Sequence, residues 1–479
     1  MCKDENERGN EVTIQTQQEA EDAVYRSYLR ASGRIRETSD RFVRRPIWAR
    51  RLLDALGSPD RGRRIILVTG SKGKGSTARY IAMLLGRMGH RVGLFTSPHL
   101  VHFNERIRIG GRAISEADFI RVMGAVEPEL RRLEARLEDD EYIGPIGIAL
   151  AAALLYFREQ RTDFDVIECG RGGAYDDTNV LANEWAVITA VMEEHVKQLG
   201  PGLSDIVRHK AGIVKPCTRT VVIGRQREDV LPLLRAELAV SFASQAGERA
   251  VAETGSGRLR MLFGGEHFGA AFPRLEAGGT KFDVWTGETE YKGLTVPALG
   301  LFQADNAAAA IQLCEQVSGC RIDEALAVSA LSAAVWPGRC EVVREHPTVI
   351  LDGAIHRDSA RYTAEVVRAL NPRRDRKVAS IIGVPADRDY AGVIGELSGV
   401  SDAVYVTRPD VSHLVFPTDA LEAAERHKPG RSRQFPVLRE AVAHAMDVER
   451  ADLVLIVGTQ TLIGNAKRLF GQSLLDLGG

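Results

Sequence analysis

The sequence has few cysteines, no long hydrophobic run and almost no net charge. Its six cysteines are scattered without a CxxC pair, which argues against a disulfide framework and a zinc site. No apolar run approaches the roughly 18 residues that span a bilayer, and the polar start lacks a signal-peptide core. Lys and Arg total 63 against 64 for Asp and Glu, so nothing attracts nucleic acid or an acidic membrane over long range. We therefore expect a cytoplasmic protein whose partners are small molecules, with no nucleic acid and no membrane.

The length and the alternation of apolar patterns predict an α/β protein of more than one domain. A chain of 479 residues with 44% hydrophobic content exceeds one ordinary core. Strand-like runs such as RIILVTG, FDVIEC, WAVITAV and RTVVIG alternate with helical patterns, as in a mostly parallel sheet covered by helices. Residues 250–300 are rich in glycine and predict a small antiparallel elaboration. A second alternating series, TVILDG to DLVLIVG, predicts a Rossmann-like C-terminal domain. The predicted units are a polar leader with an N-terminal helix (1–45), a central domain (46–336) and a C-terminal domain (337–479).

One glycine-rich stretch, VTGSKGKGSTARY at residues 68–80, lies between a predicted strand and a predicted helix. Its glycines allow backbone N–H groups to converge on phosphate oxygens at the helix start. Its second lysine would add a cation, and a hydroxyl that follows would bind magnesium. A turn without a ligand is the alternative, although the context on both sides favours a phosphate loop. The candidate nucleotide-binding residues of this stretch are Gly70, Gly73, Lys74, Gly75, Ser76 and Thr77.

The loop GSKGKGST resembles the GTNGKGST phosphate loop of the Mur ligase superfamily, in its folylpolyglutamate synthase and dihydrofolate synthase branch. Further blocks follow in that branch's order, from about residue 46 to about residue 465. They include TSPHL, NERIRI, ECGRGGAYDDTN, EEHVKQLG, RHKAGI, LGLFQADNAAAAI, WPGRCEVV, LDGAIHRDSAR and GVPADRD. An accidental match of this many ordered blocks is implausible.

Two of these blocks place side chains at the ends of predicted strands. Glu168 ends FDVIEC and His195 follows WAVITAV, at the sheet edge where open α/β sheets bind ligands. Magnesium prefers oxygen ligands, so Glu168 and the Ser76 hydroxyl suit a first magnesium ion. The resemblance implies that His195 binds a second magnesium ion. A hydrogen-bonded structural histidine is the alternative for that residue on sequence alone.

The resemblance also implies roles for residues outside the phosphate loop. It places Lys210 near the metals as a lysine that is carbamylated in the family, whereas a solvated surface lysine is the ordinary alternative. It implies that Arg339 reaches the ATP phosphates, that Gln303 and Asn306 face the base, and that Asp352 lies near the ribose and phosphates. The implied catalytic residues are Lys74, His195, Lys210 and Arg339, and the implied acceptor-binding residues are Ser97, Pro98, His99 and Arg106.

The implied reaction is ATP-dependent amide formation. A folate-type carboxylate would take the γ-phosphoryl group of ATP as an acyl phosphate, and an amino acid, L-glutamate in this branch, would then displace phosphate. ATP and Mg²⁺ are the implied cofactors, and a monomer is implied. Several positions depart from the family pattern, namely Ser71, Lys72, Glu194, His209, Phe302, Ile355 and His356, and GPIGIAL at 144–150 lacks the usual Phe-Glu. These departures leave open a specialised paralogue that uses another carboxylate or amino acid. A nucleotide-binding regulatory protein without catalysis and a phosphotransferase to a hydroxyl are further alternatives.

Overall fold

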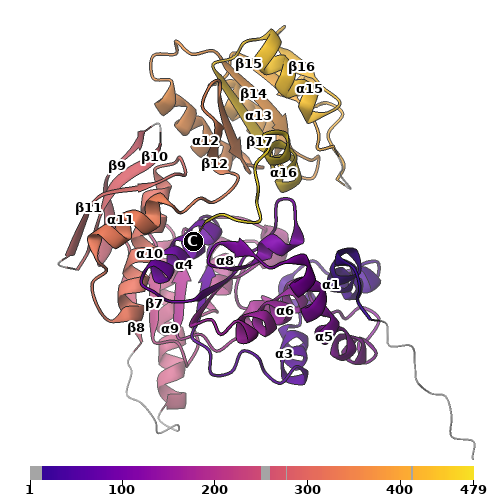
Figure 1. The fold of residues 1–479 in the computed structure, drawn as a ribbon, viewed down its shortest axis with the longest axis vertical. Helices are drawn as coiled ribbons and strands as arrows, with labels where there is room; N and C mark the ends of the chain where they lie inside the picture. Colours follow the sequence, from indigo (N-terminus) through magenta and orange to yellow (C-terminus); the bar gives the residue numbers. More distant parts are fainter. Residues whose placement is uncertain (1–12, 250–258, 277, 288, 411–413, 479) are drawn as a thin grey trace, which may run out of the picture.

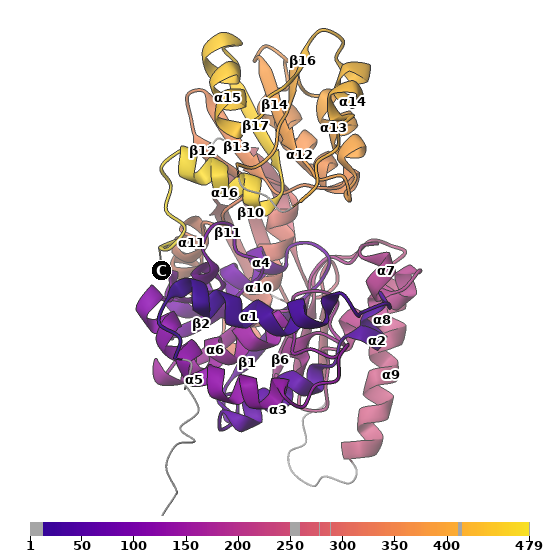
Figure 2. The same ribbon diagram turned by 90° about the vertical axis from the view of Figure 1, so that its right-hand side faces the viewer.

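The structure, a computed structural model, describes residues 13–249, 259–276, 278–287, 289–410 and 414–478. Side chains are described over the same ranges except for 241–249. Residues 1–12 of the predicted leader and residues 250–258 of the predicted antiparallel elaboration lie outside the described residues. The C-terminal domain is stacked on the central domain along the long axis of the molecule (Figures 1 and 2).

The central domain is built on an eight-stranded sheet with the order β4-β3-β2-β5-β1-β6-β7-β8. Neighbouring strands from β2 to β8 run parallel, and β3 and β4 form an antiparallel edge. This arrangement confirms the predicted mostly parallel sheet. The strands are β1 Ile65–Thr69, β2 Val92–Phe95, β3 Ile107–Ile109, β4 Arg112–Ala113, β5 Phe164–Glu168, β6 Trp185–Ile188, β7 Thr220–Ile223 and β8 Arg260–Phe263.

Helices cover both faces of this sheet because every residue of β1 is apolar except the last, and alternate residues face opposite sides. Ile65 and Leu67 join a core with α1, α3, α5 and α6, whereas Ile66 and Val68 join a core with α4, α10 and α11. The helices are α1 Gln17–Ser32, α2 Asp40–Val43, α3 Pro46–Ala55, α4 Lys74–Arg87, η1 Phe103–Arg106, α5 Glu116–Glu134, α6 Pro145–Glu159, η2 Asp177–Val180, α7 Val196–Leu199, α8 Leu203–Ala211, α9 Leu231–Arg249, α10 Phe302–Ser318 and α11 Glu324–Ser332. Among the described residues, no helix is both long enough and apolar enough to cross a membrane.

A three-stranded antiparallel sheet with the order β11-β10-β9 packs on α10 and confirms the predicted small elaboration. Its strands are β9 Phe268–Glu276, β10 Gly279–Thr286 and β11 Thr289–Val296. β8, from the same stretch of sequence, instead extends the large parallel sheet.

The C-terminal domain is a six-stranded sheet with the order β12-β13-β17-β14-β15-β16, parallel except for β12. α12, α13 and α14 cover one face, and α15 and α16 cover the other. This confirms the predicted second α/β unit. Its elements are β12 Arg339–Arg344, β13 Thr348–Asp352, α12 Arg357–Leu370, β14 Val378–Gly383, α13 Tyr390–Ser398, β15 Ala403–Val406, α14 Ala420–His427, β16 Ser432–Gln434, α15 Leu438–Ala443, η3 His444–Val448, β17 Leu453–Gly458 and α16 Gln460–Leu469.

Residues 474–478, here called the C-terminal strap, return to the central domain after α16 (Figure 1). The backbone N–H of Ala113 in β4 donates to the Leu475 carbonyl at 2.7 Å. Two buried guanidinium groups hold neighbouring carbonyls, since Arg79 donates to Leu477 at 3.0 Å and Arg108 donates to Leu474 at 2.6 Å. The strap thus ties the end of the C-terminal domain to the edge of the large sheet.

Candidate active site

The glycine-rich stretch forms the turn from β1 to α4, as the sequence predicts. Gly70 has φ 143° and Gly73 has φ 84°, a region that favours glycine. A Cβ on Gly70 would lie 1.9 Å from the Thr189 hydroxyl oxygen, and one on Gly73 would lie 2.3 Å from the Asn306 Oδ1. The two glycines therefore allow the loop to lie directly against β6 and α10.

The loop is anchored to the segment after β6. The N–H groups of Ser71 and Lys72 both donate to the Ala190 carbonyl, at 2.8 and 3.2 Å. The Thr189 hydroxyl donates to the Lys72 carbonyl at 2.6 Å, and the Ser71 hydroxyl donates to the Met192 carbonyl at 3.0 Å. These contacts fix the backbone from which the lysines of the loop project.

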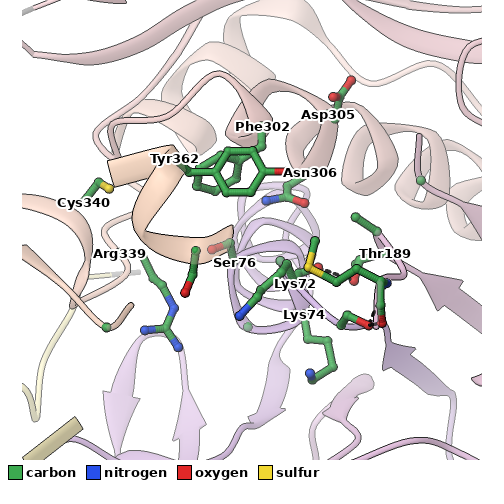
Figure 3. A pocket seen from close by; sticks show the side chains of 18 of the residues that line it. Lys72, Lys74, Ser76, Thr189, Phe302, Asp305, Asn306, Arg339, Cys340 and Tyr362 are labelled. Carbon is green, nitrogen blue, oxygen red and sulfur yellow. Dashed lines mark hydrogen bonds between the residues drawn. The ribbon is translucent and has the colours of Figure 1, made fainter. Parts of the chain in front are cut away.

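A cavity between the two domains lies over this loop (Figure 3). It contains most of the predicted nucleotide-binding residues, together with the predicted metal ligands Ser76 and Glu168. Arg339, at the start of β12, and Asp352, at the end of β13, come from the C-terminal domain. The predicted residues that line the cavity are Gly73, Lys74, Gly75, Ser76, Glu168, Asn306, Arg339 and Asp352.

Several predicted nucleotide-binding side chains form hydrogen bonds within the protein. Gln303 is fully buried outside the cavity lining, and its Oε1 accepts from Tyr80 and from Asn306, both at 3.1 Å. Gln303 therefore orients Asn306. The Lys74 ammonium donates to the Gly70 carbonyl at 2.9 Å. Asp352 accepts from the Cys340 N–H at 2.9 Å through one oxygen, and through the other from the Thr363 hydroxyl and the Ala354 N–H, both at 3.0 Å.

Glu168 is the carboxylate best placed to hold a cation. It ends β5, is buried, and accepts from the Ser97 N–H at 3.1 Å. Burial raises the pKa of Glu168, and the nearby charge of Lys74 opposes that rise. A magnesium ion beside the carboxylate would favour its charged form and would suit the hydroxyl of Ser76 in the same cavity. The hydroxyl of Thr77 is buried below the loop without a hydrogen-bond partner.

The predicted metal ligand His195 precedes α7 with φ 49° and does not line the cavity. Burial lowers the pKa of His195 to about 4 and the charge of Glu194 opposes that change, while the charges of Lys74 and Lys210 also act on it. Within the described ranges, no three His, Cys, Asp or Glu side chains gather as a metal cluster. His356, one of the departures from the family pattern, immediately precedes α12 and is also outside the cavity lining. Any magnesium here would take most of its ligands from phosphate and water.

Lys210 is fully buried on α8, although its sequence context is typical of a surface helix. Its ammonium pairs with Glu194 at 2.9 Å. Burial lowers the pKa of Lys210 to about 8, while the charge of Glu194 opposes that change. The neighbouring His209 is buried against the ring of Tyr175, at 5.2 Å between centroids.

The predicted acceptor-binding residues fall into two pairs. Ser97 and Pro98 line a second, smaller cavity, which shares Gly75, Glu168 and Arg339 with the first. His99 and Arg106 lie outside both cavities, where the Arg106 Nε donates to the His99 Nδ1 at 3.0 Å. Burial and this guanidinium lower the pKa of His99 to about 4, so the ring is neutral near pH 7.

The cavity also contains residues that the sequence reasoning did not assign. Phe302 of α10 and Tyr362 of α12 meet across the domain boundary with ring centroids 5.5 Å apart at 69° (Figure 3). Lys72 of the loop also lines the cavity. Phe302 and Lys72 are both departures from the family pattern, and that difference could have marked them in the sequence as residues of the site. Nothing in the sequence marks Tyr362, because it is one residue of an ordinary amphipathic helix.

Comparison with known proteins identifies the family. The model of the Mur ligase middle domain matches residues 68–314, and that of the Mur ligase glutamate ligase domain matches residues 338–460. The chain is 31% identical over 450 residues to the folylpolyglutamate synthase of Lacticaseibacillus casei, covering 91% of this chain and 98% of that one. The chain belongs to the Mur ligase family, in its folylpolyglutamate synthase branch. The suspected resemblance is thereby confirmed.

Other relatives support the same assignment of this Mur ligase to the folylpolyglutamate synthase branch. The dihydrofolate synthase/folylpolyglutamate synthase of Bacillus subtilis is 32% identical over 383 residues, covering 78% of this chain and 84% of that one. The folylpolyglutamate synthase of Mycobacterium tuberculosis, solved with ADP and AMPPCP, matches with a TM-score of 0.80 at 26% identity, over 95% of this chain and 99% of that one. A folylpolyglutamate synthase solved with AMPPCP and folate matches with a TM-score of 0.76 at 28% identity, over the same shares of the two chains.

Proposed function

We propose that this chain is an ATP-dependent ligase that joins L-glutamate to the carboxylate of a folate-type acceptor. The observation that carries the proposal is one cavity in which the phosphate loop of the central domain faces Arg339 of the C-terminal domain. Relatives that match nearly the whole chain are folylpolyglutamate synthases, and one of them is solved with AMPPCP and folate. The assignment of ATP and folate as substrates therefore rests on these relatives. The cavity itself supplies cationic and hydroxyl groups that suit phosphate.

The reaction takes place in two displacements. An oxygen of the acceptor carboxylate attacks the γ-phosphorus of ATP, the bond to the bridging oxygen breaks, and ADP leaves with that electron pair. The amine of glutamate then attacks the carbonyl carbon of the acyl phosphate, inorganic phosphate leaves, and the nitrogen loses a proton. Positioning and electrostatic stabilisation are what the protein supplies in such transfers.

The chain's own residues divide this work. Lys74, which lies at the first turn of α4, binds phosphate oxygens in exchange for the Gly70 carbonyl. Arg339 stabilises the charge on the transferring group from the opposite domain. Ser76 and Glu168 would hold magnesium, which when bound neutralises phosphate charge. Phe302 and Tyr362 offer an aromatic surface for the base next to Asn306.

Lys210 is proposed as a carbamylated residue. An amine whose pKa is lowered to about 8 has a substantial neutral fraction near that pH. The neutral amine is the form that adds carbon dioxide, and the product is an oxygen ligand in place of an ammonium group. Two observations support a place near the nucleotide: Lys210 pairs with Glu194, and the charge of Lys74 also acts on its pKa.

The acceptor carboxylate is proposed to lie where the two cavities meet. Both are lined by Glu168 and Arg339, and the smaller one adds Ser97 and Pro98. His99 and Arg106 would support this segment from behind, since they bond to each other. His195 stays a predicted ligand of a second magnesium ion, without a contact in this structure that supports it.

Mass spectrometry of the reaction products tests the proposed function. Purified protein is incubated with ATP, magnesium and glutamate, and with either dihydropteroate or tetrahydrofolate. We expect a glutamyl adduct with at least one acceptor and none with the Lys74→Ala variant. ATP binding without an adduct to either acceptor would refute the folate assignment and direct the search to other carboxylates. ADP formation without an acyl phosphate that hydroxylamine traps would indicate transfer to a hydroxyl instead.

Three further expectations stay predictions. The domain limits at residues 45 and 336 can be checked by limited proteolysis, the monomeric state by light scattering, and the cytoplasmic location by cell fractionation.

A further inference from the structure

We propose that Lys72 is a second phosphate-binding cation of the loop, specific for the terminal phosphoryl group of ATP. This inference rests on the proposed ATP-dependent function. The residue stands where the family pattern has no cation, and it acts together with Arg339 across the domain boundary.

The backbone of Lys72 is held on both sides of its side chain. Its N–H donates to the Ala190 carbonyl at 3.2 Å, and its carbonyl accepts from the Thr189 hydroxyl at 2.6 Å. The adjacent Ser71 is bonded to the same segment through both its N–H and its hydroxyl. A side chain that leaves so constrained a backbone has a limited set of directions, and this one lines the cavity.

The ammonium of Lys72 differs from those of the other two lysines near the site. Lys74 donates to the Gly70 carbonyl, and Lys210 pairs with Glu194. Across the described part of the chain, the Lys72 ammonium has no hydrogen-bond or ion-pair partner. Lys72 is half-buried, and burial lowers its pKa because the charged form is less well solvated there, while the charges of Glu194 and Asp352 oppose that change. A partly desolvated cation that forms no ion pair gains when an anion binds beside it.

The surrounding charges indicate where that anion lies. Arg339 and Lys74 both disfavour the charge on Lys72, so three cations act on one another across the cavity. Glu194 and Asp352 offset part of this repulsion, but both already have partners: Glu194 pairs with Lys210, and Asp352 accepts from backbone N–H groups and a hydroxyl. In Figure 3 the Lys72 side chain extends toward the Arg339 side of the cavity. Arg339 comes from the opposite domain, so a group held by both residues is the outermost phosphate rather than the phosphates inside the loop.

Comparison of two nucleotides separates this role from a structural one. Affinities for ADP and for AMPPCP are measured with magnesium for the parent protein, Lys72→Met, Lys72→Arg and the matched control Lys292→Met, whose lysine is exposed on β11. We expect Lys72→Met to lower the affinity for AMPPCP about tenfold or more and the affinity for ADP less than about threefold. Lys72→Arg should restore most of the AMPPCP affinity, and Lys292→Met should change neither.

The melting temperature without nucleotide is the second readout. Removal of an unpaired, half-buried charge should leave the melting temperature of Lys72→Met unchanged or raise it. Equal losses of ADP and AMPPCP affinity, or a lowered melting temperature with no change in their ratio, would overturn the proposal. Because these are binding measurements, they stay informative if no glutamyl product forms, so a failed ligase assay and a failed role for Lys72 are distinguishable.

Discussion

Replacement of Glu194 by glutamine tests the electrostatics around Lys210. The glutamine amide keeps an oxygen that accepts from the lysine, so the substitution removes the charge and little else. Lys210 is fully buried and Glu194 is 18% exposed, with 2.9 Å between nitrogen and oxygen. Without the carboxylate, the pKa of Lys210 falls further below the value of about 8 that it has in the fold.

The size of the effect follows from proton linkage. The pKa of Lys210 in the folded protein lies below the unfolded value of 10.5, so the free energy of unfolding rises as the pH increases from 8 to 10.5. Below pH 8 the folded protein carries the full cost of a buried, charged lysine. At pH 7 that cost is about 3 kcal/mol in the parent protein, since each pH unit between the two pKa values contributes slightly more than about 1 kcal/mol. A lysine that becomes fully neutral in the fold at pH 7 adds to this cost only the one pH unit between 8 and 7. The substitution therefore destabilises the protein by at most about 1 kcal/mol at pH 7 and by almost nothing at pH 9.

Denaturant unfolding in buffer free of carbon dioxide measures this difference, with the parent protein and Glu194→Gln compared at pH 7 and pH 9. Glu184→Gln is the matched control, because Glu184 pairs with the exposed Arg219 at 3.2 Å. The control should lose less than about 1 kcal/mol, equally at both pH values. Equal destabilisation by Glu194→Gln at pH 7 and pH 9 would refute the linkage to Lys210.

Two further predictions concern buried contacts of each domain. Lys467→Met should lower the free energy of unfolding by about 3–5 kcal/mol, because Lys467 is 2% exposed and its loss leaves the buried Glu341 carboxylate without a cation. Urea unfolding measures this change, and a decrease smaller than about 1 kcal/mol would contradict the prediction. Gly73→Ala should weaken ATP binding strongly, because its Cβ would lie 2.3 Å from Asn306 at a positive φ that costs about 1–2 kcal/mol. Calorimetry compares it with Gly86→Ala, a substitution in open space on α4 that should leave binding unchanged.

The sequence predicted those parts of the site that follow from local pattern. The loop between β1 and α4 was recognisable from its glycine and lysine spacing, and Glu168 from its place at the end of a buried strand. Parallel strands bring their carboxyl ends to one edge, so these two features had to meet. The same reasoning cannot predict which face of a helix is turned toward the cavity. Gln303 and Asn306 lie one turn apart on α10, yet Asn306 lines the cavity and Gln303 is buried beneath it.

Contacts between the two domains were beyond prediction from the sequence for a different reason. Tyr362 meets Phe302 only because α12 lies close to the first residue of α10, and that approach depends on how the surfaces of both domains fit together. Lys210 reads as a surface lysine in its helical pattern, whereas tertiary packing buries it fully. Departures from the family pattern at Phe302 and Lys72 proved informative, since both side chains line the cavity.

The C-terminal strap restricts how the two domains can move. The C-terminal domain is joined to the central domain through the chain before β12 and again through residues 474–478, whose carbonyls are held by Arg79 and Arg108. A rotation of the C-terminal domain about the line through these two attachments would leave both intact, although it would separate α16 from Leu100 and α12 from β9. A rotation in any other direction would first have to release the strap.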